Sequence, residues 1–103
     1  MIKVSVFYPH KDDAKFNMDY YLTKHIPLVR QRFGTALKGV SVEQGIAGGA
    51  PNSPAPFVAV CQMLFDGIAE VQSVMGTHGP ELMGDVPNFS NIEPTVQISE
   101  VKI

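Results

Sequence analysis

Hydrophobic and polar side chains alternate along the first residues of the chain. Apolar residues occupy every even position from Ile2 to Tyr8, and Pro9 follows them. Alternation with a period of two is typical of a strand with one buried face, and proline seldom occurs inside such a strand. The pattern therefore predicts a first strand that Pro9 closes.

Between residues 17 and 33 the spacing of apolar residues becomes that of a helix. Asn17 is a favourable N-cap, and Gly34 is a common residue just after a helix end. At 3.6 residues per turn, one apolar stripe collects Met18, Tyr21, Leu22, His25, Val29 and Phe33. Pro27 falls on the opposite side, where water can bind the carbonyl group that loses its partner. We expect the helix to bend there.

The middle of the chain predicts a strand, a loop and another strand. Residues 37–44 alternate again and predict the second strand. Residues 45–56, GIAGGAPNSPAP, are too rich in glycine and proline for a helix or a strand. We expect a long loop there, and such loops are often functional. Residues 57–65, FVAVCQMLF, are almost all apolar, which is typical of a strand inside a sheet with both faces covered.

A second helix is expected to follow, with Asp66 as its N-cap. Gly76, Gly79 and Pro80 disfavour a helix, so we expect an interruption there and a short second piece that continues to Val86.

The last strand is predicted over residues 95–103. Its apolar positions change phase near Ser99 and Glu100, which indicates a bulge. The complete order is βαββαβ, so we predict an α+β, ferredoxin-like fold in which an antiparallel sheet carries two helices on one face. We expect residues 1–103 to form one domain.

Composition and charge narrow the class of protein. The 103 residues are 45% hydrophobic and 17% charged, so a second copy is expected to cover the free face of the sheet as a homodimer. A net charge of −2 and the absence of a basic run argue against nucleic-acid binding. A single cysteine, Cys61, cannot form an internal disulfide, and we expect an inert core residue. Without a signal or membrane segment, the chain is expected to be cytoplasmic.

His25 lies near the centre of the apolar stripe, and two interpretations are open. One is a core histidine bonded to a backbone carbonyl group that the bend leaves free. The other is a histidine that lines a pocket between helix and sheet, where imidazole can transfer a proton.

Other side chains are candidates for the same pocket. Tyr21 lies one turn before His25, and His78 lies where the second helix is expected to break; both are candidate catalytic groups, with a core tyrosine and an exposed histidine as the alternatives. Ser5 is a polar residue on an otherwise apolar strand face. The candidate ligand-binding residues are Ser5, Phe7, Leu22 and Val29.

No cofactor or metal is predicted. His10, Asp12 and Asp13 are clustered, but their spacing matches no standard set of metal ligands. No glycine-rich phosphate motif links a strand to a helix. Haem would need an axial ligand such as His25 or His78 and is the less favoured alternative.

The stretch FNMDYYLTKHIPLV, with VSVFYP before it and GGAPNSPAPF and NIEPTVQISEV after it, resembles the EthD-like family. This family is named for ethyl tert-butyl ether degradation and belongs to the dimeric α+β barrel superfamily. The most specific part is the pattern Y-Y-x-x-x-H-x-P-L, carried by Tyr20, Tyr21, His25, Pro27 and Leu28. The resemblance implies a homodimer with a pocket between sheet and helices in each subunit. It also implies a loose link to oxidoreductases, but no catalytic motif that could be transferred.

Two functions follow as hypotheses. The first is a cofactor-independent oxidoreductase or lyase-type enzyme in which His25 acts as a general base on a small hydrophobic substrate, with Tyr21 or His78 stabilising the anion. The second is a non-catalytic protein that binds a hydrophobic metabolite for a partner oxygenase. Polar groups that converge with His25 on one pocket would favour the enzyme.

Overall fold

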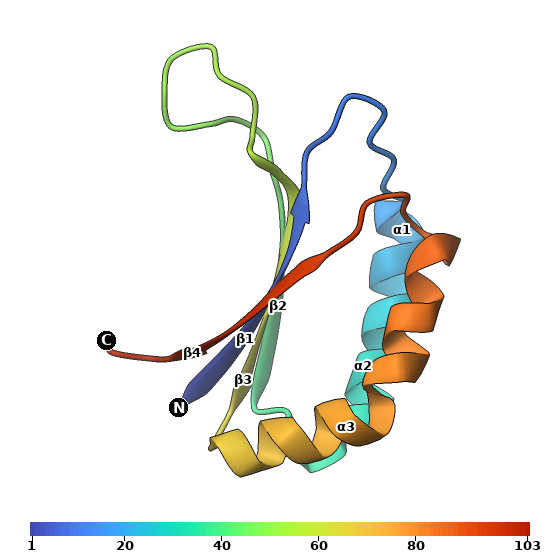
Figure 1. Ribbon diagram of the computed structural model, residues 1–103, viewed down its shortest axis with the longest axis vertical. Coiled ribbons are helices and arrows are strands. Elements are labelled where there is room, and N and C mark those ends of the chain that lie inside the picture. The colour runs from blue at the N-terminus through green and yellow to red at the C-terminus, as the bar shows by residue number, and fades with distance from the viewer.

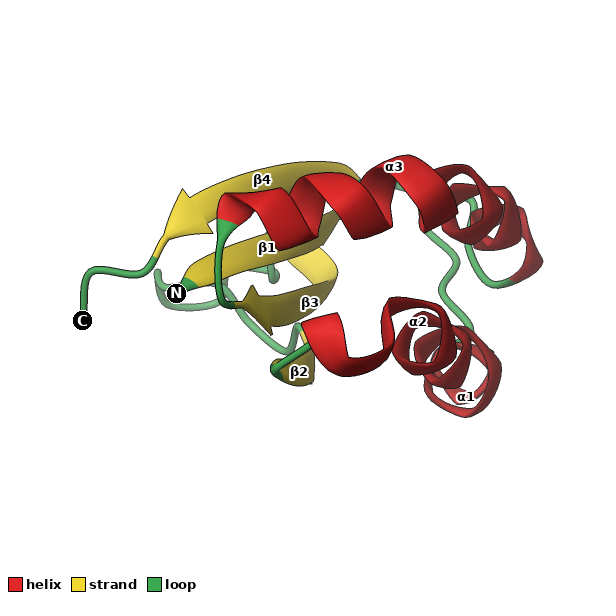
Figure 2. Cartoon of the chain, turned by 90° about the horizontal axis from the view of Figure 1, so that it is seen from below, coloured by secondary structure: helices red, strands yellow, loops and turns green.

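The computed structural model describes all residues from 1 to 103 (Figure 1). The strands β1 (Ile2–Pro9), β2 (Gly39–Gln44), β3 (Phe57–Phe65) and β4 (Thr95–Glu100) form one antiparallel sheet in the order β2-β3-β1-β4. The helices lie together on one face of this sheet, as Figure 1 and Figure 2 show. The predicted ferredoxin-like fold class is therefore confirmed.

The first helical region consists of four consecutive segments. They are α1 (Met18–Tyr20), a π-helical turn η1 (Tyr21–His25), α2 (Ile26–Phe33) and a 3-10 turn η2 (Gly34–Ala36). The side chain of Asn17 accepts a hydrogen bond from the backbone N–H of Tyr20 at 3.0 Å, as expected of an N-cap. Gly34 has a φ of 58°, a left-handed conformation that suits glycine after a helix end.

The π-helical turn accommodates Pro27. The backbone N–H of Ile26 bonds to the carbonyl oxygen of Tyr21, five residues earlier. Pro27 then lies in the first turn of α2, where a missing N–H is tolerated. The wider turn also changes which side chains face the sheet. Ile26 is buried, whereas Leu22 is 48% exposed, so the prediction that placed Leu22 on the buried stripe was wrong because it assumed 3.6 residues per turn.

β3 lies between β2 and β1, inside the sheet, as its apolar sequence predicted. The side chains that face the helices are buried: Ala59, Cys61, Met63 and Phe65. The alternate residues, on the other face, are only half-buried within one chain. Within one chain, the face of β3 that points away from the helices is therefore only partly covered.

α3 (Ile68–Asp85) is one continuous helix, so the expected interruption was wrong. Pro80 lies inside it and cannot donate to the carbonyl group of Gly76. Gly79 precedes Pro80, and α3 changes direction along its length (Figure 1). A 3-10 turn, η3 (Val86–Asn88), follows it. None of the helices has the length and apolar composition that crossing a membrane requires.

Two predicted details at the ends of elements were also wrong. Gly67, not Asp66, is the N-cap of α3, and no side chain caps this end. β4 ends at Glu100 and pairs with β1 in unbroken register, so it has no bulge near Ser99. The irregularity of the sheet lies instead between β1 and β3, next to Pro9, which cannot donate a hydrogen bond to the sheet.

The base of the loop 45–56 depends on one glycine. A Cβ atom on Gly45 would overlap the carbonyl oxygen of Phe57 and lie 2.8 Å from the Cβ of Ala55. We expect Gly45→Ala to lower the free energy of unfolding by about 1–3 kcal/mol in urea denaturation, because the backbone must shift. Gly49→Ala is the control, since a Cβ there meets nothing within 4 Å. Equal losses for the two variants would contradict this account.

Candidate functional site

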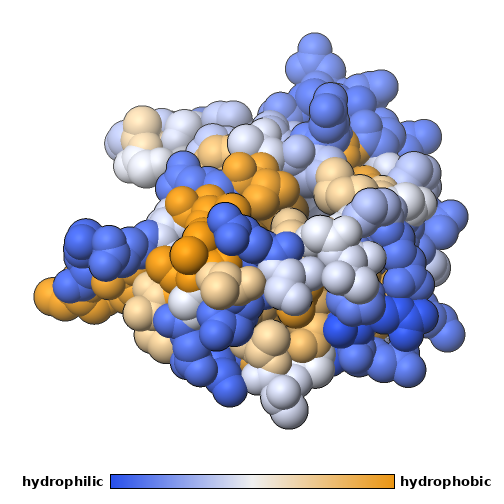
Figure 3. Space-filling model, turned by 60° about the horizontal axis from the view of Figure 1, so that its bottom comes forward, coloured by the Kyte–Doolittle hydropathy of each residue, from blue (hydrophilic) through white to orange (hydrophobic).

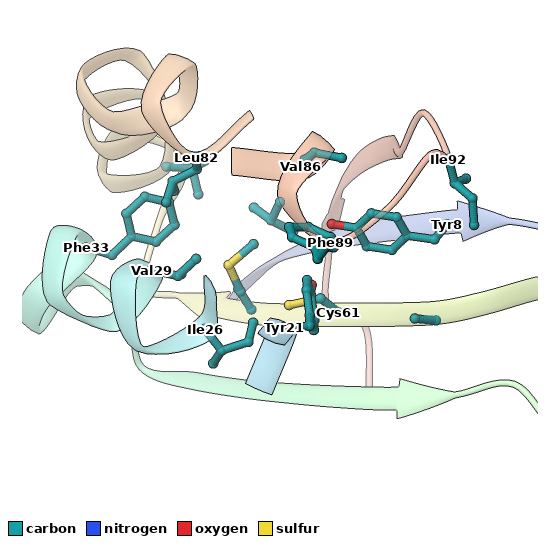
Figure 4. Close-up of a cluster of buried hydrophobic side chains, with 14 of the residues drawn as sticks. Tyr8, Tyr21, Ile26, Val29, Phe33, Cys61, Leu82, Val86, Phe89 and Ile92 are labelled. Atoms are coloured by element: carbon teal, nitrogen blue, oxygen red, sulfur yellow. The ribbon is translucent and has the colours of Figure 1, made fainter. Parts of the chain in front are cut away.

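A cavity of about 60 Å³ lies between the sheet and the helices α2 and α3. Thirteen of the fifteen residues that line it are hydrophobic, so a ligand inside it meets a dry, apolar wall. The sheet contributes Val6, Tyr8, Cys61, Met63 and Val96. Figure 4 shows several of the surrounding side chains in the core.

His25 lines this cavity and is almost fully buried. It lies at the end of the π-helical turn, and its ring packs against two aromatic side chains that also contact each other. The ring of Tyr21 is stacked on it with centroids 5.2 Å apart and planes at 16°, and the ring of Phe89 lies 4.8 Å away. These contacts fix the plane of the imidazole.

A hydrogen bond to a carboxylate holds the imidazole ring in one orientation within that plane. Nδ1 of His25 lies 2.9 Å from Oδ2 of Asp85, and both side chains are largely buried. An ionised carboxylate can only accept, so Nδ1 of His25 carries a proton and donates it. In the neutral ring the lone pair is then on Nε2.

Nε2 of His25 is free to meet a ligand. His25 forms no hydrogen bond through Nε2. Every fully buried side-chain nitrogen and oxygen atom of the chain has a hydrogen-bond partner. Nε2 is thus the ring nitrogen without a protein partner, and His25 is one of the residues that line the cavity.

Asp85 accepts two further side-chain hydrogen bonds. The hydroxyl of Tyr20 and the amide of Asn88 both donate to its Oδ1, each at 2.8 Å. Burial alone would raise the pKa of Asp85, but the hydrogen bonds from Asn88, His25 and Tyr20 outweigh it and hold the pKa below its ordinary value. Asp85 is therefore an anion at neutral pH.

Three further side chains with polar atoms, Tyr8, Tyr21 and Cys61, line the cavity. Burial raises the pKa of Tyr8 to about 12, although a hydrogen bond with Tyr21 lowers it. Burial also raises the pKa of Tyr21 and of Cys61, which interact with each other. All three side chains are protonated at neutral pH, and the hydroxyl of Tyr21 donates within the group. Figure 4 shows Tyr8, Tyr21 and Cys61 in one part of the core, close to Phe89.

The structure brings together only some of the residues that the sequence suggested. His25, Tyr21 and Val29 line the cavity. Ser5 and Phe7 lie on the opposite face of β1, because the even positions of this strand face the helices.

Leu22 and His78 do not line the cavity either. Leu22 is exposed. The ring of His78, on α3, lies 6.4 Å from that of Phe33 and remains outside the cavity. The polar groups that join His25 are therefore Tyr21, as suggested, and Tyr8 in place of His78.

Asp85 was missed by reasoning from the sequence alone. It is the last residue of α3, and an acidic side chain is unfavourable at the negative end of the helix dipole. An acid in that position is a signal that a buried partner compensates for its charge. No group of three or more His, Cys, Asp or Glu side chains is placed to hold a metal ion.

Comparison with known proteins extends this description. The family model of the EthD domain matches residues 9–93. The crystal structure of an EthD-like protein from Ralstonia eutropha JMP134 is similar, with 41% sequence identity and a TM-score of 0.93, over 99% of this chain and 92% of that one. No curated protein sequence matches the chain.

Two further solved structures resemble the fold at low sequence identity. One is an antibiotic biosynthesis monooxygenase, with 15% identity and a TM-score of 0.51 over the whole of both chains. The other is a dimeric protein of unknown function with a ferredoxin-like fold from Bacteroides fragilis NCTC 9343, with 11% identity and a TM-score of 0.52, over 97% of this chain and 95% of that one. Because the domain match covers most of the sequence and the relative from Ralstonia eutropha is similar over almost its whole length, the chain belongs to the EthD family.

Proposed function

We propose that the chain is an enzyme of small-molecule metabolism in which His25 acts as a general base on an apolar substrate. The observation that carries this proposal is the hydrogen bond of 2.9 Å between Nδ1 of His25 and Asp85. It leaves the lone pair of the neutral imidazole on Nε2, beside an apolar cavity. General-base catalysis requires a base held within hydrogen-bond reach of the proton that it removes, and a fixed imidazole that lines the cavity is suited to that role.

The proposed step is proton transfer from an acidic C–H or O–H group of the substrate to Nε2 of His25. The imidazolium that forms is stabilised by the negative charge of Asp85. Tyr8 and Tyr21 also line the cavity, and the proposed donor to the substrate anion is the hydroxyl group of Tyr8, which Tyr21 supports by donating to it. Such general-base catalysis contributes about 10²–10⁴-fold to a rate. The step requires no resident cofactor, and Cys61 takes no part in it as a thiol.

The fate of the substrate anion defines the reaction class. In an oxidoreductase, dioxygen as co-substrate would accept electrons from the anion; in a lyase-type reaction, the anion would expel a leaving group. The fold neighbour named a monooxygenase is in keeping with the oxidative outcome, as an analogy at the level of the fold.

We propose that two copies associate through the sheet face that the helices leave open. Phe7 and Val60 face each other across β1 and β3 on that side and are only half-buried, and the rings of Phe7 and Phe57 are 5.0 Å apart. Val58 and Leu64 of β3 lie on the same side and are also only half-buried. Figure 3, in which the bottom of the molecule is turned forward, shows hydrophobic residues gathered in a surface patch on that side. A structural neighbour is described as dimeric.

Light scattering at micromolar concentration should give twice the chain mass of 11.2 kDa, because an interface above roughly 1,600 Å² in total is expected to persist there. Val60→Asp would place a charge on the half-buried sheet face and should shift the mass toward that of a single chain. Leu22→Asp is the control, since Leu22 is 48% exposed and lies in the first helical region, which covers the other face of the sheet. A monomeric wild type would contradict the association.

The role of His25 can be tested with His25→Asn. The asparagine amide can take the place of Nδ1–H against Asp85, but it removes Nε2. We expect hydrogen–deuterium exchange at the acidic carbon of small ketones and nitroalkanes, followed by proton NMR in D₂O, to fall by about 10²–10⁴-fold relative to the wild type. His25→Asn should keep the fold. His25→Ala should lower the free energy of unfolding by about 1–3 kcal/mol, because it removes one of the hydrogen-bond donors to Asp85.

Two results would decide against the proposed base. Exchange at an equal rate in His25→Asn would show that another group takes the proton. Saturable binding of these compounds without any exchange would favour the alternative, a non-catalytic protein that holds a hydrophobic metabolite for a partner oxygenase.

Asp85 should make the stability of the chain depend on acid pH. Its folded-state pKa lies below the ordinary value of 3.8, so its contribution is fully present above pH 3.8 and is lost as the pH falls through the lowered pKa. In urea denaturation, the wild type should exceed Asp85→Asn by about 1–3 kcal/mol at pH 6, and the difference should shrink toward pH 2. Asp12→Asn, an exposed control, should change little at either pH. A difference that stays constant with pH would contradict this assignment.

A further inference from the structure

The charges around the cavity restrict the ligands that it can hold. No lysine or arginine lines the cavity. Arg32, on the neighbouring part of α2, is already paired with Glu81 on α3 through hydrogen bonds of 2.8 and 3.1 Å. The one ionised group bonded to a lining side chain is Asp85, behind His25. The cavity therefore has one negative charge beside it, and no positively charged side chain lines it that could balance the charge of an anionic ligand.

An anionic ligand would be unfavourable for this reason. Entering the apolar cavity, it would lose its hydration without gaining a positive partner, because a protonated His25 is already neutralised by Asp85. A cationic ligand would lose its hydration too, and the ring of His25 lies between the cavity and the carboxylate. An uncharged ligand avoids both losses.

The polar groups of the cavity also indicate the chemical group on the ligand. Tyr8 is protonated and can donate to an oxygen atom, since its own hydroxyl oxygen accepts from Tyr21, while Nε2 of His25 can accept a proton. A carbonyl compound uses both functions. Its oxygen accepts from a tyrosine hydroxyl, and a hydrogen on the adjacent carbon is acidic enough to be removed. The proton goes to Nε2, and the electron pair of the C–H bond moves to the carbonyl oxygen as an enolate.

A ligand with one ring would require the wall of the cavity to move. An apolar cavity of roughly 150 Å³ holds a benzene ring, whereas this one measures about 60 Å³. Met63, Met75 and Met83 line it, and the unbranched methionine side chain adapts its shape easily. Met63 is buried in the sheet, but Met83 is 47% exposed and is the methionine most free to move outward. Val96, also exposed, faces the same cavity from β4.

We propose that the cavity selects uncharged carbonyl compounds about the size of one ring, and that Met83 sets the largest ring that it admits. This inference rests on the proposed function, because it names the substrate class on which His25 would act. It adds a charge filter and a size limit that proton transfer alone does not require.

The experiment measures dissociation constants by protein NMR titration with two probe series. Cyclohexanone, cyclohexanecarboxylate and cyclohexylammonium share one ring and differ in charge; cyclopentanone, cyclohexanone and cyclo-octanone differ in size. The wild type should bind cyclohexanone at least about tenfold more tightly than either charged compound. Met83→Ala should improve the binding of cyclo-octanone relative to cyclopentanone by about tenfold or more. Ile68→Ala is the control, because Ile68 lies on the same helix, is also 47% exposed and does not line the cavity.

Each contrary result overturns a stated part. Equal binding of ketone and carboxylate, or no ketone binding at millimolar concentration, would overturn the charge filter and the substrate class. Equal effects of Met83→Ala and Ile68→Ala would overturn the size limit. Hydrogen exchange supplies the separate readout: selective binding of cyclohexanone without His25-dependent exchange would leave the selectivity in place and overturn the proposed base.

Discussion

The carboxylate of Asp85 is the group on which the site depends. It accepts hydrogen bonds from Tyr20, His25 and Asn88, and so connects the end of α3 to the first helical region. Its charge is buried at the unfavourable end of a helix dipole and persists because three donors surround it. The same bonds decide which nitrogen of His25 holds the proton. One ionised group therefore both links the two helical regions and orients His25.

Much of the fold could be predicted from the sequence, because burial imposes a period on each element. The alternation before Pro9 and the apolar run of residues 57–65 predicted β1 and β3, including the interior place of β3. The π-helical turn could not be predicted from a pattern drawn at 3.6 residues per turn, although Pro27 signalled an irregularity. The continuity of α3 was missed because propensity disfavours Pro80, while neighbouring turns and tertiary packing hold the helix together.

The site was less predictable than the fold. His25 and Tyr21 could be identified because both lie on one apolar helix face, and polar or titratable groups on such a face are unusual. Asp85 lies 60 residues from His25 in sequence, and only the tertiary fold brings them together. Ser5 was placed on the wrong side of the sheet for the cavity. The choice between the two faces of β1 depends on where the helices pack, which alternation alone does not specify.

The composition of α3 has a consequence for how the chain opens. Gly76 and Gly79 have nothing within 4 Å of the position of a Cβ, so close packing does not require glycine at either site. Together with Pro80 they lower the intrinsic helix propensity of this segment by several kcal/mol relative to alanine. We therefore expect the second half of α3, which carries Met83 on its outer side, to open locally at a low free-energy cost. Amide hydrogens there should exchange by local opening, well before those of β1 and β3, and the interior could be reached without unfolding the sheet.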